Sequence, residues 1–258
     1  MLRKEFSVDR LSVKVYDDRQ SMGQAAAEDA VAYLKDLLAE KDDVWCIFAA
    51  APSQNEVLAA LVASEGVDWS RVHAIHMDEY VNLSEDAPQG FGNFLRRAIF
   101  DRLPFASIEY IGSMGDPQEK IDRYTAILEE HKIDIVFMGI GENGHIAFND
   151  PHVADFNDPL KIKVVDLDLK CRQQQVNDGC FTKLDDVPTH AITLTVPTLF
   201  SGSRLFCVVP ASSKADAVRA TVEGPVSELC PATVMRNHDN ATLYCDCDSA
   251  KYLLSPSR

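Results

Sequence analysis

The chain has 258 residues, of which 46% are hydrophobic and 25% charged, and its formal net charge is −15. This composition suits one large α/β domain with a full-sized core, and the acidic excess argues against nucleic-acid and membrane partners. No apolar run approaches the roughly 18 residues of a membrane span, and no signal-peptide core follows Met1, so we expect a cytoplasmic protein.

The seven cysteines include no Cys-x-x-Cys pair, and their number is odd. In a reducing compartment such residues are expected to be small buried hydrophobic side chains rather than disulfides. Cys245 and Cys247 would point to opposite faces of an expected strand, which argues against a metal ion shared between them. The sequence therefore predicts no metal site.

Alternating or wholly apolar stretches predict strands, and apolar residues at helical spacing predict helices. The expected strands are 11–16, 44–48, 72–77, 110–111, 133–137, 161–165, 191–195, 204–209 and 241–245. The expected helices are 20–41, a helix ending at Ala63, 91–103, 117–130 and a helix from Pro210 to Glu223. No internal repeat, linker or low-complexity segment interrupts this order, so the whole chain is expected to form one domain, 1–258.

The loop 49–56 follows the second expected strand and leads into a helix. Ser53-x-x-Glu56 has the spacing of a capping box, in which the Ser53 hydroxyl accepts a bond from the helix N-terminus. In that interpretation the hydroxyl is occupied, and Glu56 places a negative charge near the start of the helix. The alternative is that Ser53 is available to a ligand.

Asp78 and its two neighbours, Glu79 and Tyr80, stand at the C-terminal end of the third expected strand. In open α/β sheets, polar side chains at the carboxyl ends of strands face the ligand crevice. The alternative is a solvated pair of acids that starts a loop. His73 and His76 lie three apart on the strand and are expected to pack or form hydrogen bonds on opposite faces.

A glycine-rich turn, 138–151, follows the buried strand 133–137 and is the chemically richest part of the sequence. Asn143, His145 and Asp150 fall within eight residues of one another. Glycines let a backbone turn sharply and approach a bound molecule, and such turns at strand ends carry the chemistry of open α/β sheets. We therefore take these three residues as catalytic candidates.

The same turn matches the dinucleotide fingerprint G-x-G-x-x-G over 139–144. That fingerprint requires a helix that opens inside the turn, in the first strand–helix–strand unit of the domain. Here the turn lies in the middle of the chain, and the sequence Asn-Asp-Pro at 149–151 ends any helix almost at once. The pattern therefore does not predict a nucleotide cofactor.

Two later segments supply polar candidates. If 171–179 is helical, Arg172 and Gln175 share a face, although an exposed polar helix explains the composition equally well. Lys214 lies in the first turn of the helix that ends at Glu223. A lysine there opposes the helix dipole, so its position indicates an anion to bind.

Three motifs together resemble the glucosamine-6-phosphate deaminase/isomerase family, which is related to the 6-phosphogluconolactonases. They are Gly-Ile-Gly-Glu-Asn-Gly-His-Ile-Ala-Phe-Asn-Asp-Pro at 139–151, His-Met-Asp-Glu-Tyr-Val at 76–81, and the segment around Lys214 and Glu223-Gly224. Their order and spacing hold over nearly the full chain. The resemblance implies a three-layer α/β fold, with an open and mostly parallel sheet flanked by helices in a modified Rossmann-like arrangement.

The resemblance also implies an activity, the conversion of an amino sugar phosphate to a ketose phosphate and ammonia without a cofactor. Under it, Asp78 is the base that moves a proton between carbons, His145 opens the sugar ring, and Asn143 and Asp150 orient His145. The phosphate would be held by Ser53 and Gln54 of the loop, by Arg172 or Gln175, and by Lys214. The only expected partner is a small sugar phosphate, and a homo-oligomer is left open.

The sequence departs from the family pattern at four places. Asn143 stands where many, though not all, family members have Asp. Ala and Pro replace the glycines of the phosphate loop at 49–52, Gln175 falls near the position of the family's phosphate-binding Arg, and Asp150 stands where the family has Glu. Two alternatives to a deaminase therefore stay open. One is an isomerase or lactonase for another sugar phosphate, such as galactosamine 6-phosphate or 6-phosphogluconolactone, and the other is a non-catalytic sugar-phosphate sensor.

Overall fold

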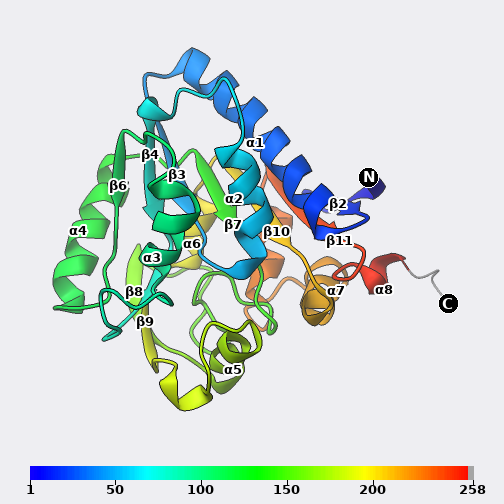
Figure 1. Ribbon diagram of the computed structural model, residues 1–258. Coiled ribbons are helices and arrows are strands. Elements are labelled where there is room, and N and C mark those ends of the chain that lie inside the picture. The colour runs from blue at the N-terminus through cyan, green and yellow to red at the C-terminus, as the bar shows by residue number, and fades with distance from the viewer. Residues whose placement is uncertain (255–258) are drawn as a thin grey trace.

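The computed structural model describes residues 1–254, which are built around an eight-stranded sheet (Figure 1). Its strands lie in the order β1 (Leu2–Val8), β2 (Leu11–Tyr16), β11 (Ala241–Asp246), β10 (Arg204–Val209), β7 (Ile135–Met138), β3 (Val44–Phe48), β4 (Val72–His76) and β6 (Ser107–Glu109). β1 and β2 pair antiparallel, and all the other neighbouring strands pair parallel. The expected open, mostly parallel sheet is confirmed.

Helices cover both faces of this sheet. Those on one face are α1 (Arg19–Glu40), α2 (Asn55–Val62) and α3 (Phe91–Leu95), and those on the other are α4 (Pro117–Glu130), α6 (Val196–Phe200), α7 (Ala215–Glu223) and α8 (Lys251–Leu254). Shorter turns of helix are η1 (Pro52–Gln54), η2 (Trp69–Arg71), η3 (Arg96–Phe100), η4 (Leu184–Asp186), η5 (Ser212–Lys214) and η6 (Pro231–Asn237). The expected three-layer α/β arrangement is therefore confirmed.

The central strand β3 shows why its sequence is wholly apolar. Trp45 and Ile47 pack into the hydrophobic cluster on one face, whereas Val44, Cys46 and Phe48 pack into the cluster on the other. A parallel strand covered by helices on both sides has no solvent face, so every position is apolar instead of every second one. The same burial on both faces holds for β7, the strand before the glycine turn.

A second, three-stranded antiparallel sheet was not expected from the sequence. It contains β5 (Asp78–Tyr80), β9 (His190–Leu194) and β8 (Ile162–Asp166), in that order. The strand β5 begins two residues after β4 ends, so the chain passes directly from the large sheet into the small one. The remaining helix, α5 (Leu169–Asn177), lies in the connection between β8 and β9 (Figure 1).

Several element boundaries differ from the expectation. The helix expected at 91–103 is α3 followed by a π-helix, η3, and the strand expected at 110–111 lies three residues earlier, as β6. The edge strand β1 was not expected at all. Most of its residues are exposed, so its sequence lacks the apolar alternation that marks a half-buried strand.

The order of the strands defines one crevice. From β3 the chain continues to β4 and β6 on one side, and then returns to the other side of β3 with β7, β10 and β11. A parallel sheet that reverses its direction of growth in this way leaves an opening at the carboxyl ends of the two strands at the reversal. The loop after β3 and the glycine turn after β7 both leave the sheet at this opening.

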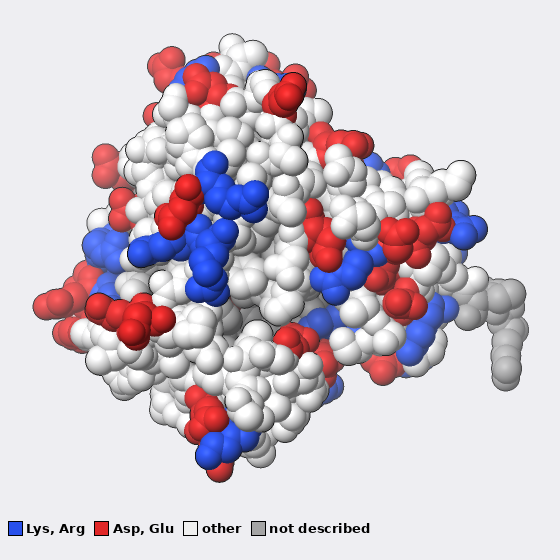
Figure 2. Space-filling model, in the orientation of Figure 1, with Lys and Arg blue, Asp and Glu red and all other residues white. Residues whose placement is uncertain are grey.

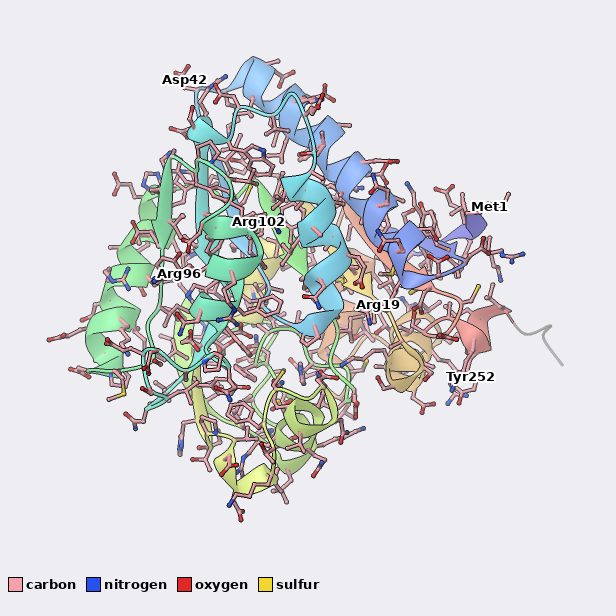
Figure 3. All side chains as sticks on the ribbon, in the orientation of Figure 1. Met1, Arg19, Asp42, Arg96, Arg102 and Tyr252 are labelled. Atoms are coloured by element: carbon pink, nitrogen blue, oxygen red, sulfur yellow. The ribbon has the colours of Figure 1, made fainter. Side chains whose placement is uncertain are left out.

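Charged side chains are unevenly distributed on the face seen in Figure 2. Asp and Glu are scattered over much of it. Lys and Arg are also found in several places, but their largest group lies where Figure 3 labels Arg96 and Arg102. Arg96, Arg97 and Arg102 are exposed on η3 and the turn that follows. Within residues 1–254, no helix combines the length and apolar character that crossing a membrane requires.

Candidate active site

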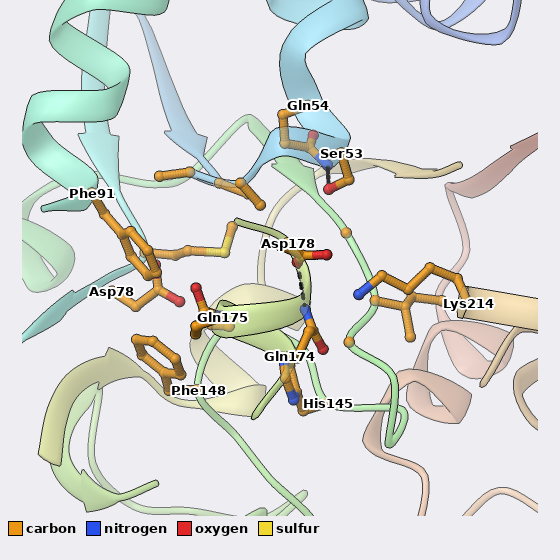
Figure 4. A pocket seen from close by; sticks show the side chains of 18 residues that line it. Ser53, Gln54, Asp78, Phe91, His145, Phe148, Gln174, Gln175, Asp178 and Lys214 are labelled. Atoms are coloured by element: carbon orange, nitrogen blue, oxygen red, sulfur yellow. Dashed lines mark hydrogen bonds between the residues drawn. The ribbon is translucent and has the colours of Figure 1, made fainter. Parts of the chain in front are cut away.

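A pocket occupies the crevice at the carboxyl ends of the parallel strands (Figure 4). Its polar lining comes from five separate segments: the loop after β3, the start of β5, the glycine turn, α5 with its C-cap, and η5. These polar residues are Ser53, Gln54, Asp78, His145, Gln174, Gln175, Asp178 and Lys214. Asp78, His145 and Lys214 are thus brought around one hollow, as the sequence predicted.

Asp78 is held in place through its backbone by a buried histidine. His76 Nδ1 lies 2.9 Å from the Asp78 carbonyl oxygen, and His76 Nε2 accepts a hydrogen bond from the Ile111 backbone N–H, also at 2.9 Å. Because Nε2 accepts, the ring hydrogen is on Nδ1, which donates to Asp78. Burial lowers the pKa of His76 to about 4, so the ring is neutral and acts as a fixed hydrogen-bonding bracket. Its expected hydrogen-bonding role is confirmed.

The Asp78 side chain is almost fully buried and lines the pocket. Burial raises the pKa of its carboxyl well above the ordinary value, and the neighbouring Glu79 carboxylate raises it further. Glu79 itself faces the start of α3, where its two oxygens accept hydrogen bonds from the backbone N–H groups of Tyr80, Phe91 and Gly92. Glu79 therefore fixes α3 beside the pocket, while Asp78 is left open to a ligand.

His145 lies against the glycine turn with one ring nitrogen engaged. Its Nδ1 is 2.9 Å from Asp150 Oδ1, and Asp150 is completely buried. Asn143 connects both residues, since its Nδ2 donates to Asp150 Oδ1 at 2.8 Å and its Oδ1 accepts from the His145 backbone N–H at 3.1 Å. Burial tends to raise the pKa of Asp150, but its bonds to His145 and Asn143 outweigh burial and lower it. Asp150 thus stays an anion beside the imidazole.

Two glycines of the turn are required by close contacts. A Cβ atom at Gly141 would lie 2.2 Å from His145 Nε2, so only a residue without a side chain lets the imidazole rest there. Gly144 has a φ of +86°, a region that favours glycine, and a Cβ atom there would lie 2.5 Å from Cys230 Sγ. Gly141 therefore makes room for His145, and Gly144 lets the turn pass close to Cys230.

Lys214 lies at the opposite end of the pocket, in the last residue of η5, which leads directly into α7. It is buried, and burial lowers the pKa of its ammonium group, although the carboxylates of Asp178 and Glu142 partly oppose the shift. A buried cation in a helix N-terminal turn is a costly arrangement unless an anion binds there. Lys214 thus lies at the pocket, and its role in holding an anion stays a prediction.

Ser53 and Gln54 also line this end of the pocket. Gln54 Nε2 donates to Ser53 Oγ at 3.1 Å and to the Val208 carbonyl oxygen at 3.2 Å, which fixes the buried amide. The expected capping box is wrong, because neither η1 nor α2 receives a hydrogen bond from a capping side chain. Glu56 instead forms an ion pair with Arg19, which Figure 3 labels; the distance from Glu56 Oε1 to Arg19 Nε is 2.7 Å. The Ser53 hydroxyl is thus available to a ligand.

Residues 171–177 are helical, as the greater part of α5, but the two candidates on this helix lie in different places. Gln175 is buried and lines the pocket. Arg172 does not line it, because its guanidinium turns to the returning loop and donates to the carbonyl oxygens of Leu184 at 2.8 Å and Val187 at 2.9 Å. Arg172 therefore does not stand in for the missing phosphate-binding arginine in this structure.

Two further polar residues of α5 and its C-cap line the pocket and were not expected there from the sequence. Gln174 Oε1 accepts a hydrogen bond from the Glu142 backbone N–H at 2.8 Å, and its Nε2 donates to Asp178 Oδ2 at 3.3 Å. Both Gln174 and Asp178 line the pocket. Their i, i+4 spacing was visible in the sequence, but nothing there indicated that this face of the helix looks into the pocket.

Two groups of side chains near the turn have spacings that a metal ion could use. Within each group the ligand atoms lie within 4.8 Å of one another; the groups are His145, Asp150 and Cys171, and Asp150, His152 and Asp168. Asp150 belongs to both, and its oxygens are already engaged by His145, Asn143 and the Asp168 backbone N–H. We interpret both groups as hydrogen-bonding clusters that support His145.

Comparison with known proteins agrees with this geometry. Residues 17–244 match the family model described as glucosamine-6-phosphate isomerases/6-phosphogluconolactonase. The chain is 35% identical over 222 residues to the glucosamine-6-phosphate deaminases of Bacillus thuringiensis (strain Al Hakam) and Bacillus anthracis (strain A0248), covering 85% of this chain and 82% of each relative.

Solved structures give the same result for the fold. A monomeric glucosamine-6-phosphate deaminase superposes with a TM-score of 0.84 at 26% identity, covering 93% of this chain and 98% of that one. A 6-phosphogluconolactonase from Thermotoga maritima superposes with a TM-score of 0.75 at 16% identity, covering 92% of this chain and 99% of that one, and shows the shared fold alone. The chain therefore belongs to the glucosamine-6-phosphate isomerase/6-phosphogluconolactonase family.

Proposed function

We propose that the protein converts an amino sugar phosphate of the glucosamine 6-phosphate type, with one water molecule, into a ketose phosphate and ammonia. The observation that carries the proposal is that Asp78, on β5, and His145, in the turn after β7, face the same pocket, with Lys214 across from them (Figure 4). A base, a proton shuttle and an anion-binding cation around one sugar-sized hollow are the groups that this chemistry needs. The named activity of relatives at 35% identity supports the same assignment.

Asp78 is assigned the proton transfer between the sugar carbons. After the ring opens, a base removes the proton from C2, and the same group delivers a proton to C1. A second proton passes from the amine to O1, which leaves an alcohol at C1 and an imine at C2. Removing a proton from carbon needs a carboxylate more basic than an exposed one, and burial beside Glu79 raises the pKa of Asp78 in that direction. Water then adds to the imine carbon and ammonia leaves, which completes the ketose.

His145 is assigned the opening of the sugar ring. Its Nδ1 is engaged by Asp150, so its Nε2 is the nitrogen that can give a proton to the ring oxygen. Asp150 and Asn143 are positioning residues, because they hold the imidazole and do not line the pocket themselves. The Asp150 carboxylate stabilises the ring whenever it carries both protons.

Lys214, Ser53, Gln54 and Gln175 are assigned the terminal anion of the substrate. Lys214 supplies the charge, and the other three supply hydrogen bonds without charge. We also propose a cytoplasmic location for the enzyme. The seven cysteines, all within the described part of the chain, are free thiols, and disulfides persist mainly in oxidising compartments.

The test is to incubate the purified protein with glucosamine 6-phosphate between pH 6 and 8 and to measure both ammonia and ketose phosphate. We expect equal amounts of the two products, and loss of both in Asp78→Asn. Galactosamine 6-phosphate and 6-phosphogluconolactone serve as the competing substrates. Hydrolysis of the lactone without ammonia release from any amino sugar would contradict the proposal in favour of a lactonase, and binding without turnover would favour a sensor.

A further inference from the structure

The two reacting side chains are carried by different sheets. Asp78 begins β5 of the small antiparallel sheet, whereas His145 lies in the turn that leaves β7 of the large sheet. A base and a proton shuttle that act on one sugar must keep their separation, since a displacement of about 1 Å can cost about 100-fold in rate. The contacts that join the turn to the small sheet therefore bear directly on the reaction.

Two adjacent residues of the turn bind two adjacent residues of β9. The Phe148 backbone N–H donates to Thr193 Oγ1 at 3.1 Å, and Asn149 Nδ2 donates to the Leu194 carbonyl oxygen at 2.8 Å. The strand β9 pairs in turn with β5, in a register that sets Thr193 opposite Asp78. These two bonds therefore attach the turn to the strand that lies beside the catalytic carboxylate.

Leu194 completes the connection through its backbone. Its carbonyl oxygen accepts from Asn149, and its N–H donates to the carbonyl oxygen of Met77, the residue before Asp78, at 2.8 Å. Two hydrogen bonds thus lead from the turn to the chain at Asp78. The side-chain amide of Asn149 is the only part of this path that a substitution can remove.

Asn149 also closes the turn on itself. The second hydrogen of its Nδ2 goes to the Ile146 carbonyl oxygen at 3.0 Å, so both amide hydrogens of this fully buried residue are used. Its Oδ1 is buried and has no hydrogen-bond partner among residues 1–254. An unpaired buried acceptor costs stability, and an apolar side chain would avoid that cost. The amide at this position is therefore explained by the two bonds that it donates.

The closed turn holds one residue in an unfavourable conformation. Ala147 lines the pocket and has a φ of +48°, in the left-handed region that favours glycine. Asn149 spans this residue twice, since its backbone N–H also donates to the Ile146 carbonyl oxygen, at 3.1 Å. Strain of this kind persists only where the surrounding bonds oppose it. Without the side-chain amide, we expect the turn to relax and to carry His145 with it.

We propose that Asn149 is a positioning residue, assisted by Thr193, which fixes the turn of His145 at the distance from Asp78 that proton transfer requires. Neither Asn149 nor Thr193 lines the pocket, so both act on the substrate only through the groups that they hold. The inference rests on the proposed function for its effect on the rate. Its geometric part, the separation of Asp78 and His145, does not depend on the substrate.

The experiment compares Asn149→Ala and Thr193→Val with wild type and gives each variant a matched control. The controls are Asn240→Ala and Thr242→Val, which remove an amide and a buried hydroxyl that both accept hydrogen bonds from Arg204. These groups lie at the amino ends of β10 and β11, at the edge of the sheet opposite the pocket. Melting temperatures show which of the proteins are folded.

Crystal structures and steady-state kinetics give the two readouts. In Asn149→Ala, the separation between the Asp78 carboxylate and the His145 ring should change by about 1 Å, and kcat for ammonia release from glucosamine 6-phosphate should fall by about 100-fold. Thr193→Val removes one bond and should lower kcat by about tenfold. KM should stay within about twofold of wild type in both, because the anion end is untouched. The controls should lose stability but keep kcat, which a purely structural role of Asn149 would also predict for Asn149→Ala.

An unchanged separation of Asp78 and His145 in a folded Asn149→Ala protein would overturn the inference. Equal losses of kcat in the variants and in their controls would do the same. If Asn149→Ala does not fold, Thr193→Val and its control decide the question by the same two readouts. A wild-type protein that releases no ammonia from any amino sugar would contradict the proposed function instead, and the crystallographic separation would still decide the inference.

Discussion

The two ends of the pocket are built differently. At the reaction end, Asp78 and His145 are nearly or fully buried, and each is fixed by a buried partner, His76 for the first and Asp150 for the second. At the anion end, one buried lysine is surrounded by amides, a hydroxyl and a carboxylate. The first end has a single preferred geometry, whereas the second offers a set of weak contacts around one charge.

The difference follows from what each end has to do. Proton transfer needs the donor and acceptor within hydrogen-bond reach, and a displacement of about 1 Å can cost about 100-fold in rate. Holding a terminal anion depends on the summed charge and hydrogen bonds, and many residue combinations can provide them. The reaction end therefore keeps most of the family motif, with Asp150 in place of Glu, while the loop 49–52 and the position of Gln175 are free to differ more strongly.

The largest effect is expected at the reaction end, from Asp78→Asn. The amide keeps the shape of the side chain but cannot accept the C2 proton, so kcat for ammonia release should fall by about 10²- to 10⁴-fold. KM should change little, because the amide still fills the same wall of the pocket. A kcat within threefold of wild type would remove Asp78 from the reaction and with it the distinction between the two ends.

The raised pKa of Asp78 leads us to expect two pH effects, one on kcat/KM and one on the free energy of unfolding. The wild-type kcat/KM should rise with pH through the elevated pKa of Asp78, so its acidic limb should lie above the ordinary value of about 3.9. Because the folded-state pKa of this acid is raised, the charged form destabilises the fold at neutral pH. Asp78→Asn should therefore raise the free energy of unfolding at pH 8 by about 1 kcal/mol or more, measured by urea titration. A loss of stability would contradict the raised pKa.

Gly141→Ala tests the fixed geometry of the same end without touching a titratable group. The new Cβ would lie 2.2 Å from the His145 ring, so the imidazole must move away from the place where Asp150 holds it. We expect kcat to fall by about 100-fold. The circular dichroism spectrum should be unchanged, and a normal kcat in a folded Gly141→Ala protein would show that His145 needs no fixed position.

At the anion end, Lys214→Met should act on binding. Loss of a hydrogen bond to a charged group is worth about 1.5–3 kcal/mol, so KM should rise at least about tenfold while kcat changes much less. Lys170→Met is the control, since Lys170 is exposed on α5 and its loss changes the net charge equally. Equal KM values for the two variants would show that the buried ammonium does not meet the substrate.

Much of the fold could be predicted because burial leaves a clear pattern. The strands β3 and β7 are buried on both faces and are wholly apolar, so their sequences identify them. The edge strand β1 is mostly exposed and carries no such pattern. The strands β8 and β9 were expected from their local pattern, but their pairing with β5 in a separate sheet depends on packing between distant segments, as does the π-helix η3.

The two ends of the site also differ in how far the sequence predicts them. Asp78 and His145 lie just beyond the carboxyl ends of the parallel strands β4 and β7, and Lys214 follows the carboxyl end of β10. The topology of the sheet alone therefore places these three residues at the crevice. Gln174 and Asp178 share a helix face by spacing, but the direction of that face is set by the bonds of α5 to the turn. The spacing of residues along the sequence therefore cannot tell whether the face with Gln174 and Asp178 or the side with Arg172 lines the pocket.

The smallest effect on activity is expected from Arg172→Gln, which sharpens the boundary of the anion end. Its guanidinium holds two carbonyl oxygens of the loop after α5, so its loss should lower the free energy of unfolding by about 1–2 kcal/mol. KM should stay within twofold of wild type, whereas Gln175→Ala on the same helix should raise KM about threefold by losing one neutral hydrogen bond. If Arg172→Gln instead raised KM tenfold with unchanged stability, the guanidinium would have to reach the substrate. The anion end would then hold two cations.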